Sequence, residues 1–172
     1  MKWFASVVVL VVSVVAVVVV GHPTGADPRS CNNLQPSGHS GSVDIGEPVL
    51  LLVEPGQDNS MEVTIKPQNS GVTYKGFLLR VLMEGSARGE FNPATTAQYK
   101  SLCTNETMSA VTHTNSNDKS SVTVKFDVTQ PGKFTFEATV VMTSKQHVAG
   151  LKNITIAEFP RTPAEPIQIT YL

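Results

Sequence analysis

The chain is poor in charge, in aromatic residues and in cysteine, and the pattern of its charges and cysteines argues against several classes of protein. Charged residues make up 16% of the 172 residues and aromatic residues 6%, and there are two cysteines. Lysine and arginine occur singly, as at Lys66, Arg80 and Lys100, so no basic run of the nucleic-acid-binding or polybasic membrane type is present. The formal net charge of −1 also argues against a cationic, membrane-disrupting peptide.

The sequence also lacks the spacings that carry catalytic or metal chemistry. The four histidines stand far apart and the cysteines form no C-x-x-C pair, so we expect no metal and no cofactor; the histidines are His22, His39, His113 and His147. Gly38-His39-Ser40-Gly41 lacks the closing glycine of a nucleophile elbow. His113 has no evident triad partner, so a structural role is favoured over a catalytic one, and we expect no enzyme.

The amino terminus has the pattern of a secretory signal peptide. Met1-Lys2 precedes an apolar run from Ala5 to Val20, and small residues follow, which places cleavage near Gly21. An uncleaved membrane anchor is the alternative, but no basic stop-transfer cluster follows the run. We therefore expect residues 1–21 to be removed and the protein to be secreted, without stable insertion in a membrane.

Removal of the first 21 residues would leave 151, the size of one ordinary domain. In the oxidising environment of secreted proteins, Cys31 and Cys103 are expected to form one disulfide, although two buried thiols are the alternative. The bridge would close a loop of 72 residues. Chain entropy gives such a bridge roughly 4 kcal/mol of stabilisation.

Two sites have the N-x-Ser/Thr pattern of N-glycosylation. Asn105 lies in a segment that resembles a loop, whereas Asn153 opens an apparent strand. A glycan on Asn153 would need an outward-facing side chain, so Asn105 is the better candidate of the two.

Strict two-residue alternation is the dominant pattern and predicts β-strands. Apolar residues alternate with polar ones over 122–128 and again over 134–142, and Pro131-Gly132 between them suits a turn. We interpret these segments as a β-hairpin with one buried and one exposed face.

Further apolar segments predict about seven strands in all, the pattern of a β-sandwich. They include residues 49–53, 61–65, 74–83 and 110–114, with late candidates around Ile154, Ile156, Ile167 and Ile169. Residues 95–102 contain helix-forming residues but a poor apolar stripe, which leaves a helix there open. Residues 22–47 are rich in Gly, Pro and Ser and are expected to be irregular and to lie over the sandwich.

Several motifs in a fixed order resemble a reeler domain, and more specifically the small secreted reeler-type defence proteins of insects. They are Cys31 with His39, Tyr74-Lys75-Gly76-Phe77, Gly89-Glu90-Phe91, Cys103, Val111-Thr112-His113 and the segment from Gly132 to Val141. Phe126 departs from the many relatives that carry Trp there, but it keeps an aromatic core residue.

The resemblance implies an immunoglobulin-like β-sandwich of about seven to nine strands over residues 22–160, followed by an extended tail over 161–172. It also implies a defence protein induced by infection, with antimicrobial activity through binding of lipopolysaccharide or other microbial surface polymers, and an association with blood cells. No ligand-binding residue can be transferred from the family. The alternative is an extracellular adhesion or matrix-binding module without an antimicrobial role.

Overall fold

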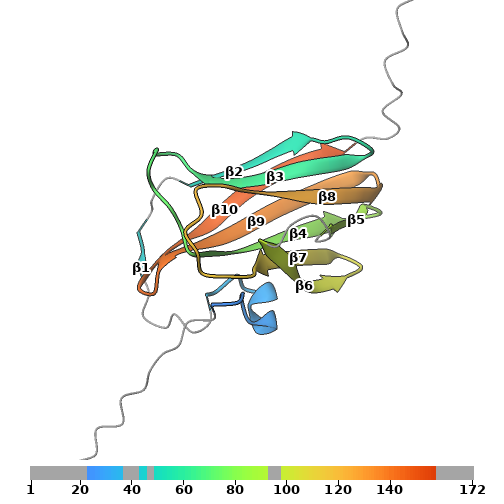
Figure 1. The fold of residues 1–172 in the computed structure, drawn as a ribbon. Helices are drawn as coiled ribbons and strands as arrows, with labels where there is room; N and C mark the ends of the chain where they lie inside the picture. Colours follow the sequence, from blue (N-terminus) through green and yellow to red (C-terminus); the bar gives the residue numbers. More distant parts are fainter. Residues whose placement is uncertain (1–22, 37–42, 46–48, 93–97, 158–172) are drawn as a thin grey trace, which may run out of the picture.

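Two β-sheets face each other (Figure 1). The hydrophobic core lies between them. The computed structural model describes residues 23–36, 43–45, 49–92 and 98–157. The predicted signal peptide, the predicted tail and the strand candidates Ile167 and Ile169 lie outside these residues.

The larger sheet has six strands and the smaller one has four. The order in the larger sheet is β1 (Val43–Asp44), β10 (Gln146–Ala157), β9 (Gly132–Thr143), β4 (Gly76–Glu84), β7 (Met108–His113) and β6 (Tyr99–Asn105). The smaller sheet runs β2 (Val49–Pro55), β3 (Ser60–Pro67), β8 (Val122–Gln130) and β5 (Arg88–Phe91). All pairs are antiparallel except the two-residue β1 with β10. The predicted all-β sandwich is confirmed.

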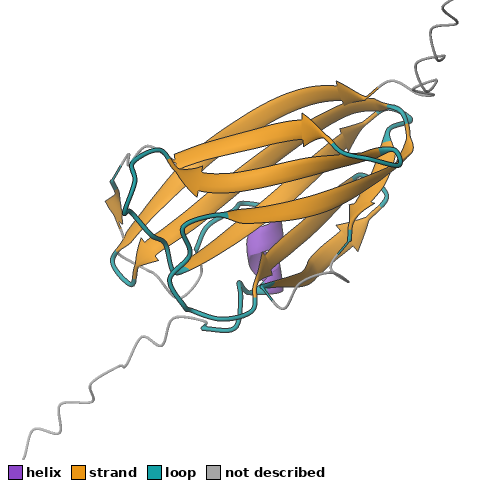
Figure 2. Ribbon diagram, turned by 45° about the horizontal axis from the view of Figure 1, so that its top comes forward, coloured by secondary structure: helices purple, strands orange, loops and turns teal. Residues whose placement is uncertain are grey.

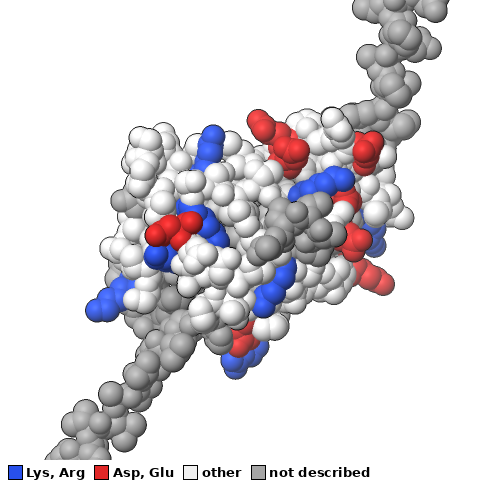
Figure 3. Space-filling view, viewed as in Figure 1, with Lys and Arg blue, Asp and Glu red and all other residues white. Residues whose placement is uncertain are grey.

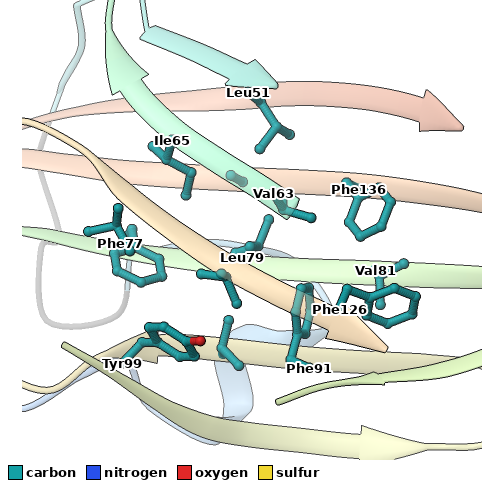
Figure 4. Packing of buried hydrophobic residues seen from close by; sticks show 14 of the residues in the cluster. Leu51, Val63, Ile65, Phe77, Leu79, Val81, Phe91, Tyr99, Phe126 and Phe136 are labelled. Carbon is teal, nitrogen blue, oxygen red and sulfur yellow. The ribbon is translucent and has the colours of Figure 1, made fainter. Parts of the chain in front are cut away.

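The core forms where the inward residues of both sheets meet, as the alternation predicts. Val63 on β3, Leu79 on β4 and Phe126 on β8 are all fully buried. Figure 4 shows these side chains pointing into the space between the sheets. Aromatic rings from opposite sheets make edge-to-face contacts; the ring centroids of Phe126 and Phe136 lie 5.4 Å apart.

The predicted hairpin between residues 122–128 and 134–142 is wrong. β8 pairs with β3 and β5, whereas β9 pairs with β4 and β10, so the turn at Pro131-Gly132 carries the chain from one sheet to the other. The alternation correctly identifies the buried face of each strand. It does not identify the partner strand, because strands in different sheets can face the same core.

The helix left open over residues 95–102 is not present where the structure describes that segment. Tyr99–Asn105 is strand β6, which pairs with the buried strand β7. Tyr99 is 3% exposed and its hydroxyl donates a 3.0 Å hydrogen bond to the carbonyl oxygen of Asn92. Sheet pairing and the burial of this ring therefore override the local preference for a helix.

Candidate ligand-binding site

The amino-terminal segment packs on the outer face of the six-stranded sheet. It contains the short 3₁₀-helix η1 (Pro28–Cys31), which Figure 2 shows in purple against that sheet. A disulfide joins Cys31 to Cys103 on β6, with the Cα atoms 6.6 Å apart, so the predicted bridge is present. A second, smaller apolar cluster fills this junction, with Leu34 from the segment and Leu78, Met108 and Ala110 from the sheet.

Arg80 on β4 binds the same segment through hydrogen bonds from the sheet. Its Nη1 atom donates to the carbonyl oxygens of Cys31 and Asn32 at 2.8 and 2.6 Å. Its Nε and Nη2 atoms donate to Glu137 Oε2 at 2.9 and 2.6 Å. The side chains of Arg80 and Glu137 are 14% and 17% exposed, so this pair is shielded from water. Arg80 thereby links the sheet to the segment next to the disulfide.

A cleft of about 390 Å³ opens between this segment and β10. Its lining residues are Asn33, Leu34, Gln35, Arg80, Glu137, Thr139, Ala149, Gly150, Leu151 and Lys152. The register between β10 and β9 shifts between Val148 and Leu151, which marks a β-bulge at the cleft wall. Gly150 in the bulge has φ +75°, a left-handed conformation that favours glycine.

Sequence reasoning missed this cleft. Arg80 stands out in the sequence only as one of several scattered basic residues, and Glu137 and Thr139 only as polar positions that alternate with core residues. Lys152 belongs to none of the sequence motifs. The one indication in the sequence was the alternation over residues 134–142, which turns the side chains at 137 and 139 away from the core.

The residues singled out for chemistry do not come together in one site. His22, His39 and Ser40 lie outside the described residues. His113 is 8% exposed at the end of β7, and the backbone N–H of Phe77 donates a 3.1 Å hydrogen bond to its Nδ1 atom. Within the described ranges, no group of three His, Cys, Asp or Glu side chains is placed to hold a metal ion.

A lysine holds together the loop that follows β7. The Lys119 Nζ atom donates to the carbonyl oxygens of Lys75, Asn115 and Asn117 at 2.7–2.9 Å. Burial lowers the pKa of this ammonium group. A hydrogen bond from Lys75 lowers the pKa of the neighbouring Asp118 carboxyl, and the two side chains form a 2.8 Å ion pair.

The two glycosylation candidates have different environments. Asn105 is exposed at the end of β6, and Thr107 in the adjoining turn donates its backbone N–H to Asn105 Oδ1 at 2.9 Å. Asn153 is half-buried on β10, and its Nδ2 atom donates to the carbonyl oxygen of Leu51 at 3.3 Å. Since a glycan is attached through Nδ2, Asn105 offers the accessible acceptor.

The visible surface carries charges of both signs side by side. Figure 3 shows Lys and Arg interspersed with Asp and Glu on the face that includes the smaller sheet. Lys125 and Asp127 on β8 form one such pair at 3.0 Å. Across the part of the chain that is described, no helix has the length and apolar character needed to span a membrane.

The match to a protein family identifies the fold. A family model described as the Reeler domain matches residues 31–159, which is most of the chain. The chain belongs to the reeler domain family. In this reeler domain, Gly76 and Phe77 of the Tyr74-Lys75-Gly76-Phe77 motif begin β4, and the Val111-Thr112-His113 motif ends β7, which pairs with β4.

A solved reeler domain has a similar fold. The reeler domain of human F-spondin (fragment 1) has a TM-score of 0.50 at 17% sequence identity, covering 68% of this chain and 95% of that chain. A structure described as the Reelin-N domain of F-spondin has a TM-score of 0.48 at 15% identity, covering 70% and 95%. No curated protein sequence matched this reeler domain. At such identities the F-spondin likeness shows the fold alone.

Proposed function

We propose that this reeler domain belongs to a secreted defence protein that binds microbial surface polymers such as lipopolysaccharide. The observation that carries the proposal is the family match over residues 31–159, together with the resemblance of its motifs to the insect defence proteins. The signal-peptide pattern of residues 1–21 supports secretion. Blood cells that gather around microbes are the proposed host partner, and induction by infection is part of the proposal.

A pull-down with purified protein lacking residues 1–21 tests this function. Whole bacteria, immobilised lipopolysaccharide and fungal glucan serve as the three targets. We expect saturable binding to at least one of them at physiological salt. The same protein after reduction and unfolding is the control, and binding to none of the three targets by the native protein would count decisively against the proposal.

An adhesion or matrix-binding role is the competing function. Immobilised heparin distinguishes the two roles, because a glycosaminoglycan-binding protein would be retained at low salt and released as the salt concentration rises. Retention on heparin with no microbial binding would replace the defence role by adhesion. Transcript measurements before and after bacterial challenge test induction, and an unchanged level would remove that part of the proposal.

The proposal includes no catalytic step. Saturable turnover of a lipid or glycan substrate that is lost when His113 is substituted would overturn it. His113 is chosen because its Nδ1 atom lies next to the hydroxyl of Thr112 and the carbonyl oxygen of Phe77. Unfolding curves of the His113 variant separate loss of activity from loss of fold.

A further inference from the structure

Thr139, one of the residues that line the cleft, has a buried hydroxyl group without a hydrogen-bond partner in the described part of the chain. Thr139 on β9 is 2% exposed, and its Oγ1 atom is the buried side-chain oxygen or nitrogen that lacks a partner among the described residues. An unsatisfied buried hydroxyl destabilises a fold, so its presence calls for an explanation. Thr139 lines the cleft beside Leu34 and Gln35, where an entering molecule would supply the missing partner.

The charges around this hydroxyl leave one positive group at the rim. Arg80 directs its donors to Glu137 and to two backbone carbonyls, so it is already satisfied. The Lys152 Nζ atom lies 3.6 Å from Glu137 Oε1, and the Lys152 side chain is 53% exposed. The cations Arg80 and Lys152 therefore share the single carboxylate of Glu137, which leaves one net positive charge. The exposed Lys152 ammonium group can donate hydrogen bonds to an additional anion.

The volume of the cleft is large enough for a small ligand. A volume of about 390 Å³ lies in the range of known small-molecule sites. Gly150 in the bulge lines the cleft, and no atom beyond its two chain neighbours lies within 4 Å of the position that a Cβ on Gly150 would occupy. Leu34 and Leu151 contribute apolar surface, and the exposed Asn33 and Gln35 contribute amide groups.

We propose that the cleft binds a single sugar residue that carries a carboxylate or phosphate group. The anionic group lies at Lys152, a ring hydroxyl exchanges a hydrogen bond with Thr139 Oγ1, and the apolar face of the ring packs against Leu151. This inference rests on the proposed function, because it names the part of a surface polymer that the domain recognises.

Entry of the sugar requires a small local movement. The Thr139 oxygen is shielded in the empty cleft, so either the exposed Gln35 side chain shifts or Thr139 turns about its Cα–Cβ bond. Rotamer changes of exposed side chains such as Gln35 occur on short timescales. The disulfide and Arg80 hold the neighbouring backbone in place meanwhile.

Titration of the labelled protein with monosaccharides tests the proposal by NMR. D-Glucuronate supplies the carboxylate, D-glucose 6-phosphate supplies the phosphate, and D-glucose is the neutral control; inorganic phosphate tests the anion without a sugar. We expect saturable shifts in the amide signals of Thr139, Gly150 and Lys152 with one or both anionic sugars, and weaker effects with D-glucose and with phosphate. The stronger anionic sugar identifies the source of the charge.

Two substitutions assign the contacts. Thr139→Val is expected to weaken binding of the anionic sugar about two- to tenfold, the effect of one hydrogen bond, and to leave the unfolding midpoint unchanged or higher. Lys152→Gln is expected to weaken binding of the anionic sugars about tenfold and to leave that of D-glucose unchanged. Thr129→Val and Lys125→Gln on β8 are the matched controls, since both residues lie in the other sheet.

The results separate this site from the proposed function. Absence of shifts with both anionic sugars, equal binding of D-glucose, or unchanged affinity in Thr139→Val would each overturn the sugar site. If the protein still binds whole bacteria in that case, the defence role stands and its binding face lies elsewhere. If the anionic sugars bind but bacteria do not, the cleft is a sugar site and the proposed function fails.

Discussion

Gly76 at the start of β4 lies directly against the imidazole ring of His113 at the end of β7. A Cβ atom on Gly76 would lie 2.5 Å from Cε1 of His113 and 2.8 Å from its Nε2. Both residues are buried, and the N–H of Phe77 donates to the same ring. The glycine of one motif and the histidine of the other are therefore a single packing unit, which explains both without a catalytic role.

Gly76→Ala is expected to destabilise the protein by about 1–3 kcal/mol, because the added methyl group overpacks this contact. Urea unfolding of the variant measures the change. A double-mutant cycle with His113→Ala is the control: the double variant should lose less than the sum of the two single losses, since the smaller side chain removes the clash. Additive losses would show that the two residues do not contact each other.

Phe126→Ala is expected to cost about 3–5 kcal/mol, because the ring is fully buried and makes edge-to-face contacts with Phe91, Phe134 and Phe136. Denaturant unfolding measures this loss. Thr129→Ala on the same strand is exposed and should stay within about 0.5 kcal/mol of the parent protein. A loss below about 1 kcal/mol for Phe126→Ala would contradict the packing of the two sheets described here.

Arg80→Met is expected to destabilise the protein by about 3 kcal/mol, because it leaves the shielded Glu137 carboxylate without its main partner. The matched control is Lys133→Met. The Lys133 Nζ atom lies 3.0 Å from Glu84 Oε2, and this ion pair joins the same two strands, β4 and β9. The side chains of that pair are 44% and 53% exposed, so its loss should cost less than about 1 kcal/mol. Equal losses in the two variants would refute a special role for Arg80.

Alkaline pH should destabilise the protein through Tyr74. Burial raises the pKa of this phenol, whose hydroxyl donates to the carbonyl oxygen of Ile65 at 3.2 Å. Below the ordinary tyrosine pKa of about 10, the phenol is neutral in both states and its contribution does not change with pH. Above that pH the unfolded state ionises first, so the free energy of unfolding falls as pH rises.

Tyr74→Phe removes the titrating group and should lose less stability than the parent protein between about pH 8 and pH 11. Urea unfolding at both pH values gives the comparison. The pKa of Lys119 is lowered by burial, which makes its own contribution rise with pH, but this contribution cancels because both proteins retain the residue. Identical pH dependence in the two proteins would refute the assignment to Tyr74.

Glycan mapping by mass spectrometry should find Asn105 occupied and Asn153 unoccupied after expression in a secreting eukaryotic host. Asn105 is exposed next to a turn, whereas the Asn153 amide nitrogen donates a hydrogen bond to the carbonyl oxygen of Leu51 on β2. Thr107→Ala should remove the glycan from Asn105. Thr155→Ala, which destroys the second site, should change the mass of the glycoprotein only by the substitution itself. Occupancy at Asn153 would show that this side chain turns outward during synthesis.

Side-chain alternation and the location of turn residues are properties of single segments, and the sequence predicts them well. The apolar residues over 122–128 and 134–142 face the core as expected. Their pairing was mispredicted, because Pro131-Gly132 connects the two sheets and the partners of β8 and β9 come from distant segments. Gly132 also lies against Ala87, where a Cβ would be 2.6 Å from the Ala87 Cβ, a contact that no local pattern reveals.

The sequence by itself determined the all-β class, the buried faces of the strands, the sulfur pair Cys31–Cys103 and the ordered motifs of the family. The strand class, the buried faces and the sulfur pair follow from local periodicity and from the number of cysteines, and the motifs are a resemblance carried by short segments; none of these depends on how the strands are arranged. Only the tertiary structure decided the cleft, because Arg80, Glu137, Thr139 and Lys152 come from three strands and meet only when register and bulge align them beneath the amino-terminal segment.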